Sequence, residues 1–307
     1  MLLCQDCPNL RNYERNKRMR VGIVGAGVMG APMAPRLLAA GHDVVVYNRT
    51  ASKIAGLIEL GAKAAATPAR AAAGSDVVIS VVTDPDAVQA VTFGPDGIAR
   101  ALSDSGVHCD MSTVTPQSAE ALAARYAREG RRFVQAPVLG SKKQIAEGTL
   151  IVLAGGASAD IDQCERAWSA FSGQVRRFPD AQQAATTKLA CNMLIAQMIL
   201  ALGQTLLYAQ TGGVDPHAVL DIIQSSNLAA PMYGPKGKTL LDRNFTPNFF
   251  VRNMLKDLNL ASLSASAFNL PQPMNAAARE LFVSAVARGY GDEDYSAVVK
   301  VLEDLAG

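Results

Sequence analysis

The sequence predicts an α/β protein in which a doubly wound parallel sheet is followed by an all-α domain. Residues 20 to about 178 alternate short β-branched apolar runs with helical patterns, which is typical of parallel strands covered by helices on both faces. After Pro179 the strand-like runs disappear, and helical patterns alone continue to the end of the chain. A chain of 307 residues is also long for one core, which favours two domains.

Individual elements follow from apolar runs and start signals. The strands expected in the first domain are Arg20–Val24, Asp43–Tyr47, Asp76–Val82, Val107–Asp110, Phe133–Val138, Leu150–Leu153 and Gln174–Phe178. Thr67-Pro68 and Thr115-Pro116 should each start a helix, because a capping hydroxyl precedes a proline at the first helical position. The later helices are expected over about Ala181–Gln210, from Asp215-Pro216, and over Lys256–Phe268, Met274–Ala287 and Tyr295–Leu305. The expected domains are 19–179 and 180–307, with a long helix between them and a flexible extension over 1–18.

Composition narrows the classes of function. Hydrophobic residues make up 49% and charged residues 18% of the chain, as in globular proteins. The net charge is only +2 and is scattered, so neither nucleic acid nor an anionic membrane surface is expected as a partner. Five dispersed cysteines favour a reducing, cytoplasmic setting over a disulfide framework, and no metal site is expected.

The longest apolar run, Leu189–Ala209, raises the question of a membrane span. It contains Asn192, Gln197 and Gln204, which would be costly to bury in lipid. We therefore expect a buried helix, inside the protein or at a subunit interface, and a homodimer or homotetramer.

A glycine motif follows the first expected strand. Gly25-Ala26-Gly27-Val28-Met29-Gly30 comes directly after Val24 and opens a helix, which is the context that a dinucleotide-binding fingerprint requires. Gly25 would allow the tight turn, Gly27 the approach of a pyrophosphate, and Gly30 close packing of helix on strand. The pyrophosphate would rest on the N–H groups at the helix N-terminus. The first domain is therefore expected to be Rossmann-type.

The end of the second expected strand indicates which dinucleotide binds. A protein that prefers NAD usually carries an acidic residue there, which binds the ribose 2′-hydroxyl. This chain has Asn48-Arg49-Thr50 instead, with Lys53 one turn later. A guanidinium can hold a 2′-phosphate by charge-assisted hydrogen bonds, so the sequence favours NADP(H). The alternative is that Arg49 is a solvated loop arginine.

Lysine rather than histidine is the candidate acid/base. His42 and His217 are expected at the surface, and His108 in a structural strand position. Lys188 and Asn192 are four residues apart, so they share one face of the long helix, where burial lowers the pKa of a lysine toward values useful for proton transfer. From periodicity alone, a lysine that extends toward solvent is the alternative.

Five motifs together resemble the β-hydroxyacid dehydrogenase family, which includes 3-hydroxyisobutyrate dehydrogenases. They are Gly25–Ala34, the cofactor-side loop Asp110–Val114, the substrate loop Ala136–Ser141, the catalytic helix Lys188–Asn192 and the motif Lys256–Leu258. They occur in family order from residue 19 onward. Gly140–Lys143 and Asn244–Phe249 are most similar to the glyoxylate/succinic semialdehyde reductase branch.

The resemblance implies a role for each matching residue. Lys188 would give a proton to the carbonyl oxygen in reduction and take one from the hydroxyl in oxidation, and Asn192 would hydrogen-bond the substrate. Thr113 would lie near the nicotinamide. Lys256 would reach toward cofactor and substrate, and Asp257 would help to position that region. The nicotinamide supplies the hydride.

One substrate-loop residue departs from the family. Leu139 stands where the family carries a serine that helps to hold the substrate carboxylate. Leucine donates no hydrogen bond, so we expect altered selectivity, with the backbone N–H groups of Gly140 and Ser141 still available and Ser141 or Lys142 able to compensate. Phe249 would line the pocket. The alternative is that Leu139 points into the core and leaves the pocket unchanged.

The resemblance also leaves two other functions open. Imine reductases are similar in architecture but generally lack a lysine at the catalytic position, so Lys188 argues against C=N reduction while Leu139 leaves it open. A binding module without activity is the second alternative, as in chromatin-associated members that have lost the catalytic lysine. Lys188 together with Asn192 opposes it. The expected partner is a small carbonyl or hydroxy acid.

Overall fold

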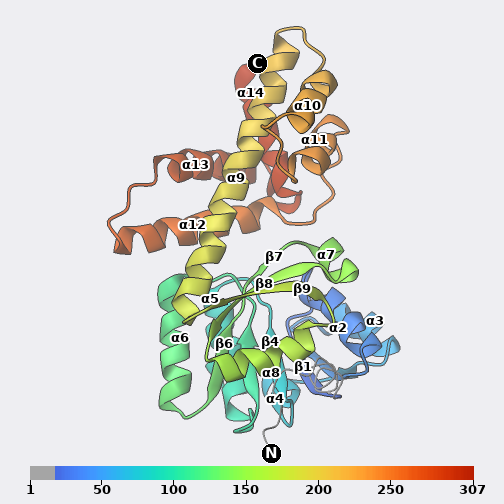
Figure 1. Cartoon of the computed structure of the whole chain (residues 1–307), viewed down its shortest axis with the longest axis vertical. Helices are drawn as coiled ribbons and strands as arrows, with labels where there is room; N and C mark the ends of the chain where they lie inside the picture. Colours follow the sequence, from blue (N-terminus) through green and yellow to red (C-terminus); the bar gives the residue numbers. More distant parts are fainter. Residues whose placement is uncertain (1–17) are drawn as a thin grey trace, which may run out of the picture. The chain divides into compact units, whose positions relative to one another are not determined.

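The computed structural model describes residues 18–307, so most of the expected extension over residues 1–18 lies outside the described part. The chain divides into two compact units (Figure 1), unit 1 up to Lys188 and unit 2 from Leu189 to Gly307. The division falls inside one helix, later than the boundary after residue 179 that the sequence predicts.

Unit 1 is built on one sheet. Its strands are β1 (Arg20–Val24), β2 (Asp43–Tyr47), β3 (Lys63–Ala64), β4 (Val77–Ser80), β5 (Val107–Asp110), β6 (Arg132–Gln135), β7 (Val138–Leu139), β8 (Leu150–Gly156) and β9 (Ser172–Phe178). The strands are arranged in the order β3-β2-β1-β4-β5-β6-β8-β7, with β9 beside β8. Neighbours from β3 to β6 are parallel, which confirms the doubly wound parallel sheet. β8 departs from this pattern, since it pairs antiparallel with β6 and β7.

Helices cover both faces of this sheet (Figure 1). They are α2 (Gly30–Ala39), α3 (Ala55–Glu59), α4 (Pro68–Ala72), α5 (Pro85–Phe93), α6 (Pro116–Arg128), α7 (Lys142–Glu147) and α8 (Ser158–Trp168). Because side chains of a strand alternate between faces, Ile23 joins the core that contains Leu37 and Trp168, whereas Val24 joins the core that contains Ala71 and Leu122.

Local signals explain where these elements start and stop. Thr67 and Thr115 cap α4 and α6 as predicted, and Asp84 caps α5 before Pro85 in the same way. The expected strand Phe133–Val138 is two strands, β6 and β7. Strand pairing is interrupted at Ala136-Pro137, because proline has no N–H to donate. The very short β3 was not predicted, because two exposed residues carry no apolar pattern.

Unit 2 is helical. Its elements are the main part of α9 (Ala181–Thr211), then α10 (Pro216–Ser225), α11 (Tyr233–Leu241), α12 (Val251–Ala267), α13 (Pro273–Ala287) and α14 (Val299–Ala306), with single 3₁₀ turns at Tyr290–Asp292 and Tyr295–Val298. Asp215 caps α10 as predicted. Helix α11 was not predicted, because Gly234, Pro235 and Gly237 disfavour helix. Helix α12 starts earlier than expected, at Val251.

Helix α9 is long and apolar enough to cross a membrane by length and composition alone. Its side chains do not form one apolar surface, since Ala184, Asn192 and Leu202 are buried while Ala190 and Tyr208 are exposed. One such helix is weak grounds for a span, because the core helix of a soluble protein passes the same test. The absence of a membrane partner stays a prediction.

Candidate active site

Each glycine of the loop between β1 and α2 has a different structural role. Gly25 has φ +103°, and an added Cβ would collide with the carbonyl oxygen of Val81. At Gly30 an added Cβ would collide with the carbonyl oxygen of Gly25, so this glycine allows helix and loop to touch. At Gly27 nothing lies within 4 Å of an added Cβ. No packing within the described chain requires Gly27, and a ligand that approaches the backbone is what its place in the motif implies.

The N-terminus of α2 suits an anion. Met29 occupies the N-cap without a side-chain hydrogen bond, and the first turn holds no acidic residue. Val28 beside it is exposed. The backbone N–H groups and the helix dipole therefore face no negative side chain of their own helix, which fits a pyrophosphate. Ala26 is different, because its N–H donates to Asn48 Oδ1 at 3.0 Å, so that amide is already used inside the protein.

Asn48 joins two loops that border the expected cofactor. Besides accepting from Ala26, its Nδ2 donates to the carbonyl oxygen of Thr50 at 2.9 Å. Its side chain thus holds the loop after β2 against the glycine loop. Arg49 and Thr50 are exposed, and no residue in the described range 18–307 forms an ion pair with Arg49. The guanidinium is therefore available to a phosphate.

The loop after β5 contains Thr113, which is half-buried and hydrogen-bonded or otherwise engaged. The loop is fixed by the buried Asp110, whose Oδ1 accepts from Ser112 Oγ at 2.8 Å and from Ser80 Oγ at 2.6 Å. Ser112 Oγ in turn accepts the N–H of Val82 at 2.9 Å. Burial raises the pKa of Asp110, and the donors around it oppose that shift.

The substrate loop corrects one expectation. Ser141 caps α7, since its Oγ accepts the N–H of Lys143 at 3.3 Å, and its hydroxyl and backbone N–H both donate to Gln144 Oε1 at 2.8 Å. The N–H and hydroxyl of Ser141 are therefore not available to hold a carboxylate, contrary to the expectation. Leu139 pairs with Ile151 in the sheet, is half-buried and lies outside the hydrophobic cores. This disfavours the alternative that Leu139 points into the core and leaves the pocket unchanged. Gly140 has φ +131°.

Helix α9 carries Lys188 and, one turn later, Asn192. Lys188 is half-buried and is engaged in a polar interaction. Asn192 is buried, and its Nδ2 donates to Asp257 Oδ2 at 2.6 Å. The other oxygen of Asp257 lies 2.9 Å from the Nζ of Lys256. Asp257 therefore links the amide of α9 to the lysine of α12 within unit 2, which fits the positioning role that the resemblance implies.

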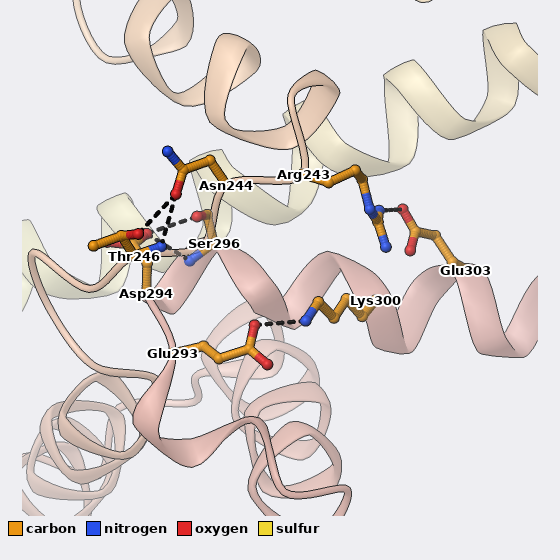
Figure 2. A network of polar contacts seen from close by, with 8 residues as sticks. All are labelled: Arg243, Asn244, Thr246, Glu293, Asp294, Ser296, Lys300 and Glu303. Atoms are coloured by element: carbon orange, nitrogen blue, oxygen red, sulfur yellow. Dashed lines mark hydrogen bonds and ion pairs between the residues drawn. The ribbon is translucent and has the colours of Figure 1, made fainter.

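Phe249 lies on a segment that Asp294 holds in place. The N–H of Tyr295 donates to the carbonyl oxygen of Phe249 at 2.7 Å, and the two rings meet edge to face. Asp294 Oδ2 accepts the N–H of Asn248 at 3.1 Å, and its Oδ1 lies 2.6 Å from the Nζ of Lys236. Figure 2 shows the contact of Asp294 with Ser296, whose hydroxyl donates to Oδ1 at 2.6 Å.

Three of these residues were missed by sequence reasoning. Asp294 has a weak signal, since an aspartate two residues before Ser296 is typical of a helix start. Ser80 lies within a buried strand and had no signal, because its partner Asp110 is 30 positions away in sequence. Gln144 had a local signal, since it stands three residues after Ser141 in a capping box. His42, expected at the surface, is buried, and its Nδ1 accepts the N–H of Met19 at 3.3 Å.

Two family models match the chain. The NAD binding domain of 6-phosphogluconate dehydrogenase matches residues 20–178. The domain described as NAD-binding of NADP-dependent 3-hydroxyisobutyrate dehydrogenase matches residues 183–302. Together they cover the sheet of unit 1 and most of the helical unit 2.

Whole-chain relatives agree with these models. The chain is 33% identical to the uncharacterized oxidoreductase YfjR of Bacillus subtilis, over 93% of this chain and 100% of that protein. It is 32% identical to a chloroplastic glyoxylate/succinic semialdehyde reductase of Arabidopsis thaliana, over 92% of this chain and 79% of that protein. The structure of a 3-hydroxyisobutyrate dehydrogenase from Salmonella typhimurium is similar with a TM-score of 0.84 and 28% identity, over 92% of this chain and 99% of that one.

Two further likenesses bear on the other functions left open by the sequence. The human nuclear factor N-PAC is 33% identical, and the chain spans 51% of its length. An imine reductase from Pseudomonas sp. has a TM-score of 0.60 at 21% identity, which shows a shared fold alone. The two family models and the relatives over nearly the whole chain decide the assignment: the chain belongs to the 3-hydroxyisobutyrate dehydrogenase-related family of NAD(P)-dependent hydroxyacid dehydrogenase-like oxidoreductases.

Proposed function

We propose that this protein is an NADP(H)-dependent oxidoreductase that interconverts a small aldehyde or keto acid and its hydroxy acid, with Lys188 as general acid/base. The observation that carries the proposal is on α9, where Lys188 stands one turn before Asn192 and Asp257 fixes the amide of Asn192 at 2.6 Å. A buried amide with a set orientation beside a lysine suits the binding of a carbonyl or hydroxyl group.

The cofactor part of the proposal rests on unit 1. Gly27 leaves its backbone open, α2 offers an uncapped N-terminus, and Arg49 is exposed without an acidic partner in the described chain. A 2′-phosphate would gain charge-assisted hydrogen bonds from Arg49, and no carboxylate at position 48 would repel it. When bound, the nicotinamide supplies or accepts the hydride.

Lys188 handles the proton in either direction. In reduction, the carbonyl carbon gains the hydride and the Nζ of Lys188 gives a proton to the carbonyl oxygen, so the product is an alcohol. In oxidation, Lys188 takes the hydroxyl proton. Asn192 would hydrogen-bond the same oxygen or its neighbour, and Asp257 would keep Asn192 and Lys256 in place.

The substrate class rests on the loop at Leu139. This position offers no hydroxyl, and the hydroxyl and N–H of Ser141 are already used in the cap of α7. Leu139 itself would contribute apolar surface. We therefore propose a carbonyl substrate with a larger or less polar group than glyoxylate. The plant relative is named for glyoxylate and succinic semialdehyde, so both belong among the compounds to be tested.

We also propose an oligomeric state and a cellular location for the enzyme. Exposed apolar side chains on α9, among them Leu194 and Tyr208, favour a homodimer or homotetramer. The three described cysteines (Cys109, Cys164 and Cys191) are free thiols, which fits a cytoplasmic location.

Initial rates test the proposal. Purified protein and NADPH are assayed by nicotinamide absorbance against glyoxylate, succinic semialdehyde, bulkier aldehydes and keto acids, and preformed imines. We expect turnover of carbonyl compounds, with kcat/KM higher for the bulkier ones than for glyoxylate. Turnover of imines alone would replace the proposal with C=N reduction. Absence of turnover with every compound, together with tight NADPH binding, would favour a binding module.

A further inference from the structure

Three loops meet at the carboxyl edge of the sheet in unit 1. They follow the neighbouring strands β1, β4 and β5, and contribute Gly25, Val81-Val82 and Ser112-Thr113. Gly25 has no room for a side chain beside the carbonyl oxygen of Val81, and the N–H of Val82 donates to Ser112 Oγ at 2.9 Å. Ligands of doubly wound sheets bind at this edge, so whatever fixes these loops also shapes the cofactor site.

Asp110 is the centre of the contacts below the loops. It is fully buried, and its Oδ1 accepts from Ser80 Oγ at 2.6 Å and from Ser112 Oγ at 2.8 Å. Its Oδ2 lies 3.2 Å from the donor Nε2 of Gln135. Among residues 18–307, no lysine or arginine forms an ion pair with it. A buried carboxylate without a cation must be satisfied by neutral donors, and these donors all come from strands or loops at the same edge.

The position of one proton follows from these contacts. A serine hydroxyl has a single hydrogen, and that of Ser112 is given to Asp110. A lone pair of Ser112 Oγ therefore faces the N–H of Val82. Asp110 thus holds the loop after β5 to the loop after β4 through one serine.

The hydrogen-bond chain continues from Asp110 through Ser80, His108 and Tyr126. Ser80 gives its only hydrogen to Asp110, so in its 2.8 Å contact with His108 the ring Nε2 must be the donor. In a neutral ring, Nδ1 then accepts, and it lies 2.7 Å from the hydroxyl of Tyr126. Burial lowers the pKa of His108 to about 3, so the ring is neutral at ordinary pH. Every hydrogen from Tyr126 through His108 and Ser80 is directed toward Asp110.

We propose that Asp110 is a positioning residue for the dinucleotide, which acts through Ser112 to preset the loops after β4 and β5 before NADP(H) binds. Ser80, with His108 and Tyr126 behind it, orients the carboxylate by donating to the same Oδ1 that Ser112 binds. The inference rests on the proposed function, since it assumes NADP(H) as the ligand. It assigns to this buried network the preorganisation that lowers the cost of ordering a binding loop.

The variant Ser112→Ala removes only the hydroxyl that joins Asp110 to the N–H of Val82, so it tests this link directly. The dissociation constant for NADPH, measured by nicotinamide fluorescence, should rise about 10-fold, which corresponds to about 1.4 kcal/mol. The loss should be larger in NADPH affinity than in kcat at saturating NADPH, because Ser112 acts by setting the loop and does not contact the reacting atoms. In the protein without cofactor, hydrogen exchange at the Val82 N–H should become faster. Asp110→Asn should weaken NADPH binding further, because its amide NH₂ would face other donors.

A matched control separates positioning from folding. Cys109→Ala changes a fully buried neighbour on the opposite face of β5. It should lower the melting temperature while NADPH binding and Val82 exchange stay as in the wild type. Wild-type binding of NADPH in Ser112→Ala, with unchanged Val82 exchange, would overturn the inference and leave the proposed function intact. Failure of the wild type itself to bind NADPH would overturn the proposed function, and this inference with it.

Discussion

In unit 1 the buried Asp110 is held by hydroxyl and amide donors alone, whereas in unit 2 the buried Asp257 and Asp294 each face a lysine. Lys256 lies 2.9 Å from Asp257, and Lys236 lies 2.6 Å from Asp294. Neutral donors fix a loop without adding positive charge beside it. A lysine pair adds a cation beside each buried carboxylate. The difference fits a division of work, with the dinucleotide bound by unit 1 and proton and substrate handled from α9 onward.

The largest effect expected from this division is on turnover. Lys188→Ala removes the proposed acid/base and should lower kcat by about 10²–10⁴-fold, the usual contribution of such a group. The dissociation constant for NADPH should stay within about 2-fold of the wild type, because Lys188 is not among the groups proposed to hold the dinucleotide. The measurement is kcat at saturating NADPH with the best substrate of the panel.

Thr186→Ala is the matched control, since Thr186 is exposed two residues earlier on α9 and its hydroxyl donates within the helix to the carbonyl oxygen of Gln182. It should turn over at the wild-type rate. Near-normal kcat for Lys188→Ala would mean that another residue handles the proton.

Unit 2 should depend strongly on one buried ion pair. Asp294→Asn leaves the ammonium of Lys236 facing a neutral amide in a site where the two side chains are 15% and 1% exposed. Breaking a buried pair on one side costs about 3–5 kcal/mol of unfolding free energy. Glu303→Gln breaks the more exposed pair with Arg243, also drawn in Figure 2, and should cost about 0–1 kcal/mol. Urea unfolding of the two variants compares them, and equal losses would contradict the distinction.

The substrate loop gives a smaller, selective effect. Leu139→Ser restores the hydroxyl that the family carries and should raise kcat/KM for glyoxylate or succinic semialdehyde by about 10–100-fold, mainly through KM, because one charge-assisted hydrogen bond contributes about 1.5–3 kcal/mol. Use of bulkier apolar carbonyls should fall. If the wild type already reduces the small acids efficiently and the variant changes neither class, Leu139 serves packing only.

Acid should destabilise unit 1 through His108. Its folded pKa is about 3, while the unfolded ring titrates near 6.5. Between these values the unfolded chain binds more protons, so the free energy of unfolding falls by about 1.4 kcal/mol per pH unit as pH drops below 6.5. The buried His42, whose pKa is also lowered by burial, adds to this loss, and the raised pKa of Asp110 opposes it.

His108→Gln isolates the contribution of one ring. Unfolding free energies of the wild type and the variant are compared between pH 7 and pH 5. The slope against pH should be smaller in the variant, and an identical slope would show that His108 is not buried in its neutral form.

The fold was largely predictable because its signals are local. Apolar runs marked most strands, and Thr67, Thr115 and Asp215 marked helix starts. The antiparallel β8 was not predictable, since direction depends on pairing and not on the composition of a strand. Helix α11 was not predicted, because the low helix propensity of its glycines argues against a helix. Tertiary packing overrides that propensity, since Gly237 lies against Leu220.

The site was predictable only as far as its motifs reach. The glycines, Lys188 and Lys256-Asp257 carry family patterns, but hydrogen-bond partners separated by many residues do not. Asn192 and Asp257 are 65 positions apart, and Ser80 and Asp110 are 30 apart. The use of Ser141 in a helix cap was missed for another reason, since Ser141 and Gln144 form a local capping box whose signal was attributed to substrate binding.

The cofactor can be tested without knowing the substrate, which makes it the most direct test of the account. The dissociation constants of NADPH and NADH are measured side by side on the wild type and on Arg49→Ala, which removes the exposed guanidinium. The wild type should bind NADPH at least about 10-fold more tightly than NADH, a difference of about 1.4 kcal/mol, and Arg49→Ala should remove most of that difference while NADH binding stays unchanged. Equal affinities in the wild type, or a preference for NADH, would contradict the assignment of NADP(H).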